Sequence, residues 1–470
     1  MHLMRCALVL AHVLLAACAT RPATLGDARP PVAVEIDALI RRGCYECLDA
    51  AFERSVEAGL SWHAFEAALL LAARSKELGL PHSGWIGAAE RHLPPGGGWQ
   101  EYLDIVVSLP LDPFSGDREA LILEAARSRR PRDTLALWRA GLQTGPGSPV
   151  LRAYLDVSLV CGPFFHAERE ATVDAVLGLH HDVPLLRYRA GICSQPQLLV
   201  ELRQQGFVDG EFDLGRAALA RARADQEEAL EHFEAARRSF PTSPSIAVAA
   251  ASLYEQREEW QQALEAYDAA LELVPTHRDA LLGRTVSLSN LGRHEDAIVS
   301  AAALIELGSW FVADAYYWRA WNHYRRGQIG EARLDVDRSR AAEASPATLV
   351  LSGVIAWREQ RLSVAEAEFS AALERDFGYC EAAQNLAEVR AASRRWDESV
   401  GAFTHAEQCF ALAIEVNRKA IDELSLTEAD VRMNAHRIAS HQRSIADAER
   451  RRVVVVERTA MVRRQSGGSR

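Results

Sequence analysis

Lysine is nearly missing from this chain of 470 residues, although basic residues are not. Lys76 and Lys419 are the two lysines among 53 basic side chains, and 64 acidic side chains leave a formal net charge of −11. Nucleic acids select proteins with an excess of positive charge, because contacts to phosphate supply most of the affinity. The acidic balance therefore argues against a nucleic-acid partner.

Long apolar runs are scarce as well. Cys6–Leu15 is an apolar run of about ten residues, whereas a membrane-spanning helix takes roughly 20. No second run of some 18 apolar residues follows it. Apolar residues make up 49% of the chain and charged residues 25%, which is typical of a globular protein. We therefore expect a folded body that is not threaded through a membrane.

The motifs of familiar enzyme classes are absent too. The chain has no H-E-x-x-H, no G-x-x-x-x-G-K, no G-x-S-x-G and no dinucleotide-binding fingerprint. His180 and His181 are adjacent, so their rings would point in different directions on a helix, and no further ligand follows at metal spacing. We expect no enzyme, no cofactor and no metal site. An enzyme with an unrecognised site in residues 34–209 remains an open alternative.

The amino terminus has the layout of an export signal. A positive charge at Arg5 precedes the apolar run, and the small residues Ala16 and Ala17 lead to Cys18. The four residues ending at Cys18 resemble the lipobox of bacterial lipoproteins. The resemblance implies removal of residues 1–17, acylation of Cys18 and attachment to a membrane. The alternative is a simple secretory signal with a chance cysteine.

The residue after Cys18 bears on location. It is Ala19, whereas an Asp there retains such lipoproteins at the inner membrane. The resemblance therefore implies the outer membrane, facing the periplasm. Residues 18–33 contain three prolines and are expected to be a tether between the lipid and the body.

A pattern of about 34 residues repeats through the second half. Its copies share an alanine, an aromatic residue four later, an alanine three after that and a proline five further on: Ala229, Phe233, Ala236 and Pro241, then Ala263, Tyr267, Ala270 and Pro275. Looser copies place the first small residue at Ala297, Ala332, Ala365 and Ser399. Small residues let two antiparallel helices approach closely, the aromatic residue fills the gap to the next pair, and proline ends the second helix.

This pattern resembles the tetratricopeptide repeat over residues 210–413. The resemblance implies about six repeats in an all-α solenoid, a right-handed superhelix of antiparallel helix pairs. Thr285 stands where the family has a smaller residue, which leaves that copy less regular. An unrelated α-helical solenoid is the alternative.

The flanking segments also have helical spacing. Residues 34–209 contain helical stretches of 12 to 18 residues between Pro/Gly turns and are interpreted as possible degenerate repeats. Residues 414–452 are expected to form closing helices. Residues 453–470 are expected to be a basic tail, either solvated or a binding site.

Six cysteines remain after Cys6 and Cys18. Cys44 and Cys47 form a C-x-x-C without a following His, without a second such pair and without a βαβ context, which argues against haem, zinc and redox chemistry. A local disulfide and two free thiols both remain open there. In the repeat register, Cys380 and Cys409 fall at the start of one helix and the end of its antiparallel mate, so their sulfurs could meet. Cys161 and Cys193 have no comparable argument.

The tetratricopeptide resemblance also implies a binding surface. In that family the first helix of each pair lines the concave face. On this register, that face receives Tyr317, Trp321 and Tyr324 from the fourth copy and Trp357 from the fifth. Aromatic side chains are the usual anchors of protein interfaces. We expect a partner segment with apolar and basic character, unless these rings pack into the solenoid or under the closing helix.

These expectations combine into a membrane-anchored lipoprotein that serves as a protein–protein interaction scaffold in the bacterial envelope. Its partner would be an unidentified envelope protein that lays an extended or helical segment in the concave groove. The alternative is an accessory lipoprotein that binds a small ligand or glycan for a transport or polysaccharide export system. Aromatic rings do not distinguish the two, because sugars also stack on them.

Overall fold

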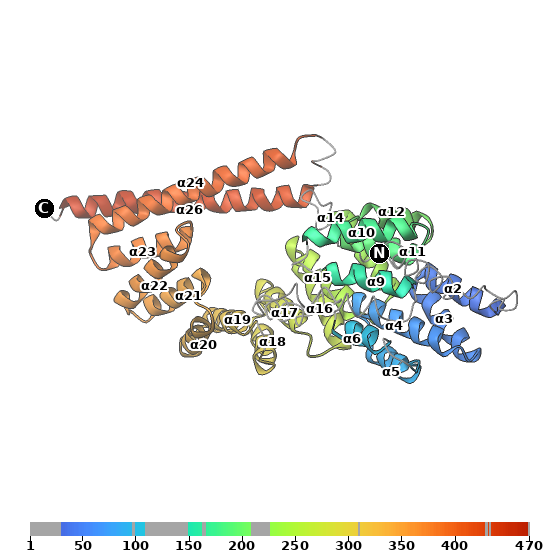
Figure 1. Ribbon diagram of the computed structural model, residues 1–470. Helices are drawn as coiled ribbons and strands as arrows, with labels where there is room; N and C mark the ends of the chain where they lie inside the picture. The colour runs from blue at the N-terminus through green and yellow to red at the C-terminus, as the bar shows by residue number, and fades with distance from the viewer. Residues whose placement is uncertain are drawn as a thin grey trace, which may run out of the picture.

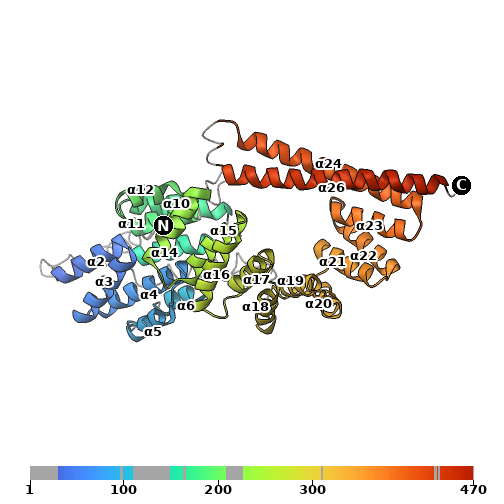
Figure 2. The same cartoon turned by 180° about the vertical axis from the view of Figure 1, so that it is seen from behind.

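The computed structural model describes residues 30–95, 99–108, 149–161, 166–207, 226–308, 311–427, 431 and 434–468. Within these ranges the regular structure consists of 21 α-helices. Consecutive helices pack against each other along the chain (Figure 1), and Figure 2 shows the same order from behind. This arrangement confirms the expected all-α solenoid of antiparallel helix pairs. Cys18 and the proposed signal segment lie outside the described residues.

The amino-terminal helices share one hydrophobic core. They are α2 (Pro31–Arg42), α3 (Tyr45–Glu57), α4 (Ser61–Glu77), α5 (Ser83–Arg91), α6 (Trp99–Ser108), α9 (Pro149–Val160), α10 (His166–His180), α11 (Pro184–Cys193) and α12 (Gln197–Gln204). Helix α4 lies at the centre, since every residue from His63 to Ser75 is buried. A helix that is covered on all sides needs apolar residues around its whole circumference, and the Ala/Leu-rich sequence of α4 supplies them.

A buried ionic cluster joins three of these helices. Near the end of α4, the Glu77 carboxylate accepts hydrogen bonds from Arg74 at 2.5 Å, from Arg189 of α11 at 2.6 Å and from Tyr154 of α9 at 2.7 Å. The Arg74 guanidinium also lies 3.8 Å from the centre of the Tyr188 ring. One carboxylate therefore compensates two buried guanidinium groups.

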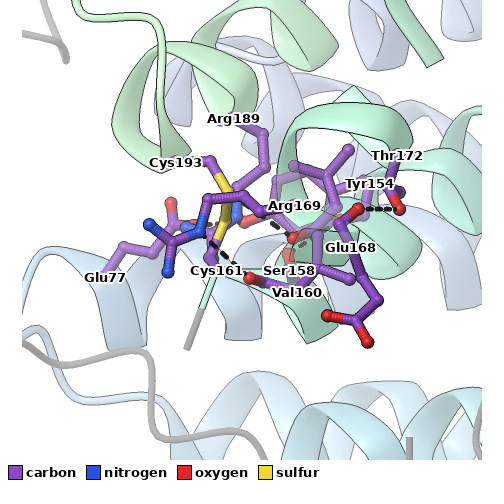
Figure 3. The surroundings of a disulfide bond; sticks show 11 residues. Glu77, Tyr154, Ser158, Val160, Cys161, Glu168, Arg169, Thr172, Arg189 and Cys193 are labelled. Carbon is purple, nitrogen blue, oxygen red and sulfur yellow. Dashed lines mark hydrogen bonds and ion pairs between the residues drawn. A yellow bond between two sulfur atoms is a disulfide. The ribbon is translucent and has the colours of Figure 1, made fainter. Parts of the chain in front are cut away.

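A disulfide lies next to this cluster. Cys161, just after α9, is bonded to Cys193 at the end of α11, with their Cα atoms 5.1 Å apart (Figure 3). The spacing of Cys161 and Cys193 in the sequence did not predict that they form a disulfide. The bond joins the same two helices that Glu77 connects through Tyr154 and Arg189.

The repeat region continues as alternating first and second helices. Its members are α14 (Gln226–Ser239), α15 (Pro244–Gln256), α16 (Trp260–Leu273), α17 (Arg278–Asn290), α18 (His294–Glu306), α19 (Val312–Arg325), α20 (Ile329–Ala342), α21 (Pro346–Arg358), α22 (Leu362–Arg375), α23 (Cys380–Ala392) and α24 (Trp396–Leu424). The small residue that marks each copy is fully buried in all six second helices: Ala229, Ala263, Ala297, Ala332, Ala365 and Ser399. Close helix crossing at these positions is therefore the feature that all six share.

Two glycines show how closely the aromatic residues approach the first helices. A Cβ atom on Gly283 of α17 would lie 2.0 Å from the ring of Tyr267 on α16. A Cβ atom on Gly353 of α21 would lie 2.5 Å from the ring of Phe369 on α22. Neither position has room for a side chain, so glycine is required there by packing.

The turn between first and second helix also repeats. Its central residue has a positive φ in five copies: 60° at Glu258, 74° at Gly292, 77° at Gly327, 62° at Gln360 and 59° at Arg394. Glycine adopts this left-handed region freely, whereas other L-residues do so at a steric cost. Three copies carry that cost at a position where two others have glycine.

A long helical hairpin completes the chain. Helix α24 has 29 residues, and α26 (Ala435–Gly468) has 34 and packs along it. We expected a repeat boundary at 413 and a basic tail over 453–470. Instead, residue 413 lies inside α24, and α26 continues to Gly468, with Val455 and Val462 buried against the core that includes Phe403. Ala448, Val455 and Val462 recur every seven residues, which is the spacing of a helix seam.

Two further disulfides lie at helix starts. Cys44, at the amino-terminal cap of α3, is bonded to Cys47, with their Cα atoms 4.9 Å apart. Cys380, the first residue of α23, is bonded to Cys409 of α24, with a Cα separation of 5.4 Å. Among the described helices, none is long and apolar enough to cross a membrane.

The ionic cluster predicts a large effect of Glu77→Gln. Removing this charge takes away the carboxylate that the buried Arg74 and Arg189 share, and the loss of one partner from comparable buried pairs lowers the free energy of unfolding by about 3–5 kcal/mol. Urea unfolding followed by circular dichroism would measure the loss. The control is Glu201→Gln, whose carboxylate pairs with Arg187 at the surface and is 51% exposed, with an expected cost below about 1 kcal/mol. Equal losses in the two variants would contradict the cluster's role.

The close approach at Gly283 predicts that Gly283→Ala destabilises the repeats. The methyl group would displace Tyr267, at a cost of about 1–3 kcal/mol. Gly401→Ala is the control, because Gly401 is exposed within α24 and a Cβ there meets nothing within 4 Å. In that control the free energy of unfolding should rise by up to about 1 kcal/mol, because alanine has a higher helix propensity than glycine. Thermal unfolding of both variants checks the opposite signs.

Candidate partner-binding groove

Three of the four aromatic residues expected in the groove lie on one helix. Tyr317, Trp321 and Tyr324 occur on α19 at spacings of four and three, which places them along one helix face. Trp357 is the penultimate residue of α21. First helices lie beside one another in the solenoid, since α19 contacts both α17 and α21. All four side chains are half-buried.

The structure brings three of these rings together and places the fourth on another core. Tyr317, Trp321 and Tyr324 pack against a small cluster formed by α19, α20 and α21. The Trp321 and Tyr324 rings are 6.2 Å apart between centroids. Trp357 packs instead against the next hydrophobic cluster along the solenoid. The aromatic residues thus cover the solenoid core with part of their surface and keep the rest exposed.

Arginine side chains lie over two of these rings. The Arg325 guanidinium is 5.5 Å from the centre of Trp321, and that of Arg358 is 5.6 Å from the centre of Tyr324. Both distances allow a cation–π attraction. Because Arg358 follows Trp357, its contact with Tyr324 connects α19 to the end of α21.

Acidic groups surround the Tyr317 end of the face. Burial, and then the neighbouring Tyr379, Glu381 and Asp314, raise the pKa of Tyr317 to about 12. Burial, followed by the charge of Glu343, raises the pKa of Asp314. The phenol of Tyr317 therefore stays neutral in a negative environment, which would attract a basic group.

The groove positions of the last repeat are already occupied from within the chain. Glu381 and Glu388 of α23 form ion pairs with Arg451 and Arg458 of α26, the first at 2.7 Å. The Nε atom of Arg458 donates to Glu388 at 2.7 Å. Sequence reasoning missed this contact. A usable signal was present, because two glutamates and two arginines share a spacing of seven residues.

A pocket of about 450 Å³ lies where α26 passes the repeats. Its wall combines residues of α23, α24 and α26 with Glu258 from the turn between α15 and α16: Glu258, Cys380, Glu381, Phe410, Ala413, Asn417, Arg443, Ser444, Asp447, Ala448, Arg450 and Arg451. The second and the last repeat thus contribute to one site. Over the described ranges, no group of His, Cys, Asp and Glu is placed to hold a metal ion.

No protein-family model matches the chain, and no curated protein matches it. Among solved structures it is similar to YrrB, described as a TPR protein with an unusual peptide-binding site, at 20% identity over 38% of this chain and 93% of that chain, with a TM-score of 0.32. A TPR protein from Thermus thermophilus is 18% identical over 39% of this chain and 98% of that chain, with a TM-score of 0.32.

A third similar structure is longer. A tetratricopeptide repeat protein from Parabacteroides merdae is 15% identical over 61% of this chain and 98% of that chain, with a TM-score of 0.32. The helix packing and the buried small residues of this chain establish its solenoid fold independently of these similarities.

Proposed function

We propose that this chain is a protein–protein interaction scaffold of the tetratricopeptide type, which binds a partner segment on the face formed by α19 and α21. One observation carries the proposal: aromatic side chains on successive first helices stay half-exposed, while the small residues that hold the solenoid together are fully buried. Large, partly exposed rings with rigid backing are the side chains that dominate binding energy at protein interfaces.

The surrounding charges define the partner's chemistry. Asp314 lies near Tyr317 and Glu343 lies near Asp314, whereas Glu381 is already paired with Arg451. A basic side chain on the partner would therefore gain favourable electrostatic energy beside Asp314. Trp321 and Trp357 offer apolar surface. The segment that fits is therefore apolar with basic residues at one end, in an extended or helical conformation.

The proposed place of action is the bacterial envelope. The lipobox-like residues that end at Cys18 and the proline-containing segment 18–33 support a lipid-anchored protein of the outer membrane, facing the periplasm. Three disulfides between the six cysteines of the body are in keeping with an oxidising compartment. The partner would accordingly be an envelope protein.

Site-specific photocrosslinking tests the groove. A benzophenone amino acid at Tyr324, in cells that produce the full-length protein, should yield a discrete protein adduct. The same probe at Val299, which is 64% exposed on the second helix α18, should yield none. The adduct should disappear when Trp321→Ala and Trp357→Ala are combined, because the anchoring rings are gone.

Circular dichroism of the Trp321→Ala/Trp357→Ala variant controls for unfolding. An adduct of the same strength at Val299, or one that survives the double substitution in a folded protein, would place the binding surface elsewhere. If Tyr324 gives no protein adduct and the purified protein binds glycans, the scaffold proposal is wrong.

Lipidation gives a second prediction. Cys18→Ser removes the thiol that would be acylated, so labelling by radioactive palmitate should be lost completely. Cys6→Ser is the matched control, because Cys6 lies in the segment expected to be removed, and it should keep the label. Several acyl chains hold a protein to a bilayer firmly, since each buried CH₂ adds about 0.8 kcal/mol. Label that persists in Cys18→Ser would contradict the anchor.

A further inference from the structure

Helix α26 contacts the repeats at two places far apart in the sequence. It pairs with α24 along its length, one end of it meets the turn between α15 and α16, and its other half lies beside α23 (Figure 1, Figure 2). We use the name strap for α26, residues 435–468. The repeats between the two contacts, α17 to α22, form an arc, and the strap connects the ends of this arc.

The contact at the second repeat consists of polar groups on the turn between α15 and α16. Glu258 pairs with Arg443 at 2.8 Å and accepts a hydrogen bond from Ser440 at 3.2 Å. Beside it, His436 lies 2.7 Å from Arg257 and 3.8 Å from Glu259. We call these residues the tip contact.

The contact at the last repeat is of a different kind. Val455 and Val462 of the strap are buried in the core that α23 and α24 share. On the adjoining face, Arg451 and Arg458 pair with Glu381 and Glu388. Apolar burial combined with these ion pairs holds this half of the strap in place, because burial contributes far more than exposed charge pairs do.

The tip contact is weak by comparison. The Glu258 and Arg443 side chains are 42% and 53% exposed, and His436 is 46% exposed. Exposed pairs of this kind each change an equilibrium by a factor of roughly 1.5 to 5 at most. Water and salt compete with them directly. The strap is therefore firmly attached to α24 along its length and to the last repeat, because His441 in its tip half also bonds Asn417 of α24 at 2.8 Å. Only its attachment to the second repeat is loose.

Glu258 occupies a left-handed backbone position at the tip contact. Glu258 has a φ of 60°, in the left-handed region, whereas Gly292 and Gly327 occupy the same turn of the two following repeats. A glutamate there carries a steric cost that glycine avoids. Gln360 and Arg394 carry the same cost in other repeats, so the feature that marks Glu258 is its carboxylate, which both Arg443 and Ser440 meet.

The strap also passes the candidate groove. Glu381, which Arg451 of the strap binds, is one of the charges that raise the pKa of Tyr317. Glu258, from the far contact, and Glu381 line the same pocket. The strap thus lies between the second repeat and the end of the aromatic face.

We propose that the strap, together with the part of α24 that packs along it, is an intramolecular clasp over the concave face, which opens at the tip contact while the other half of the strap stays packed on α23. Opening separates the strap from Glu258 and widens access to Tyr317 and its neighbours. The opening is independent of the proposed function, whereas its effect on partner access rests on that function.

A distance measurement tests the opening without any partner. Spin labels are attached through ketone-bearing amino acids at Gln262 of α16 and Gln442 of the strap, both exposed, in the full-length protein. Double electron–electron resonance should give a narrow short distance for the wild type. In Glu258→Gly, the fraction at longer distance should rise by a factor of about 3 to 10, because the tip contact loses its carboxylate.

The Glu258→Gly variant should fold at least as well as the wild type, since glycine suits that turn. Gln360→Gly is the matched control, because Gln360 has the same conformation as Glu258 three repeats further on, with a φ of 62°. This variant should leave the distance between the labels unchanged. Charge reversal adds a rescue: Glu258→Arg opens the clasp, and Glu258→Arg with Arg443→Glu closes it again. Arg394 shows that arginine is accepted in this turn.

High salt should act in the same direction, since at 1 M the Debye length falls to about 3 Å. A distance distribution in Glu258→Gly and Glu258→Arg identical to that of the wild type would overturn the clasp. An equal opening in Gln360→Gly would overturn the assignment of the opening to Glu258.

Photocrosslinking at Tyr324 then separates the two proposals. Opening with increased adduct supports both the clasp and partner binding. Opening with no adduct in any variant supports the clasp and contradicts partner binding.

Discussion

Close packing at one small residue per repeat is the constraint on which the rest of the structure depends. Ala229, Ala263 and their equivalents are fully buried where two helices cross, and aromatic rings such as Tyr267 press so tightly on a neighbouring helix that Gly283 has no room for a Cβ atom. This packing sets the distance and angle between successive pairs. It therefore sets the arc that carries the first helices, and with them the aromatic face.

The aromatic face illustrates how structural and binding roles can share residues. Tyr317, Trp321 and Tyr324 cover a small core between α19 and α21, so their rings are held rigidly. Rigid rings lose little conformational freedom on binding, which favours their use as anchors. The acidic groups near Tyr317 add direction, because they distinguish one end of the face from the other.

Two ionic assemblies in this chain differ in what they do. The cluster around Glu77 is buried and connects α4, α9 and α11, with the Cys161–Cys193 disulfide beside it (Figure 3). Breaking such a cluster is costly, so it acts as a permanent part of the core. The tip contact at Glu258 is exposed and weak. The difference in burial therefore explains why the Glu77 cluster is a permanent part of the core, whereas the contact at Glu258 can break and re-form.

Local patterning was enough to predict the helices, the 34-residue register and the buried small residues, because each of these depends on residues within one repeat and its neighbour. The resemblance to the tetratricopeptide repeat then placed Tyr317, Trp321 and Tyr324 on one helix. The sequence did not indicate that Trp357 packs on a separate hydrophobic cluster. It also missed the length of α26, the pairing of Cys161 with Cys193 and the Glu77 cluster. These features depend on which distant segments meet, and a seven-residue spacing on α26 shows that a helix needs a partner without showing which one. Only the curvature of the assembled repeats brings Glu258 and Glu381 to the same helix, since that curvature is the sum of many small packing angles.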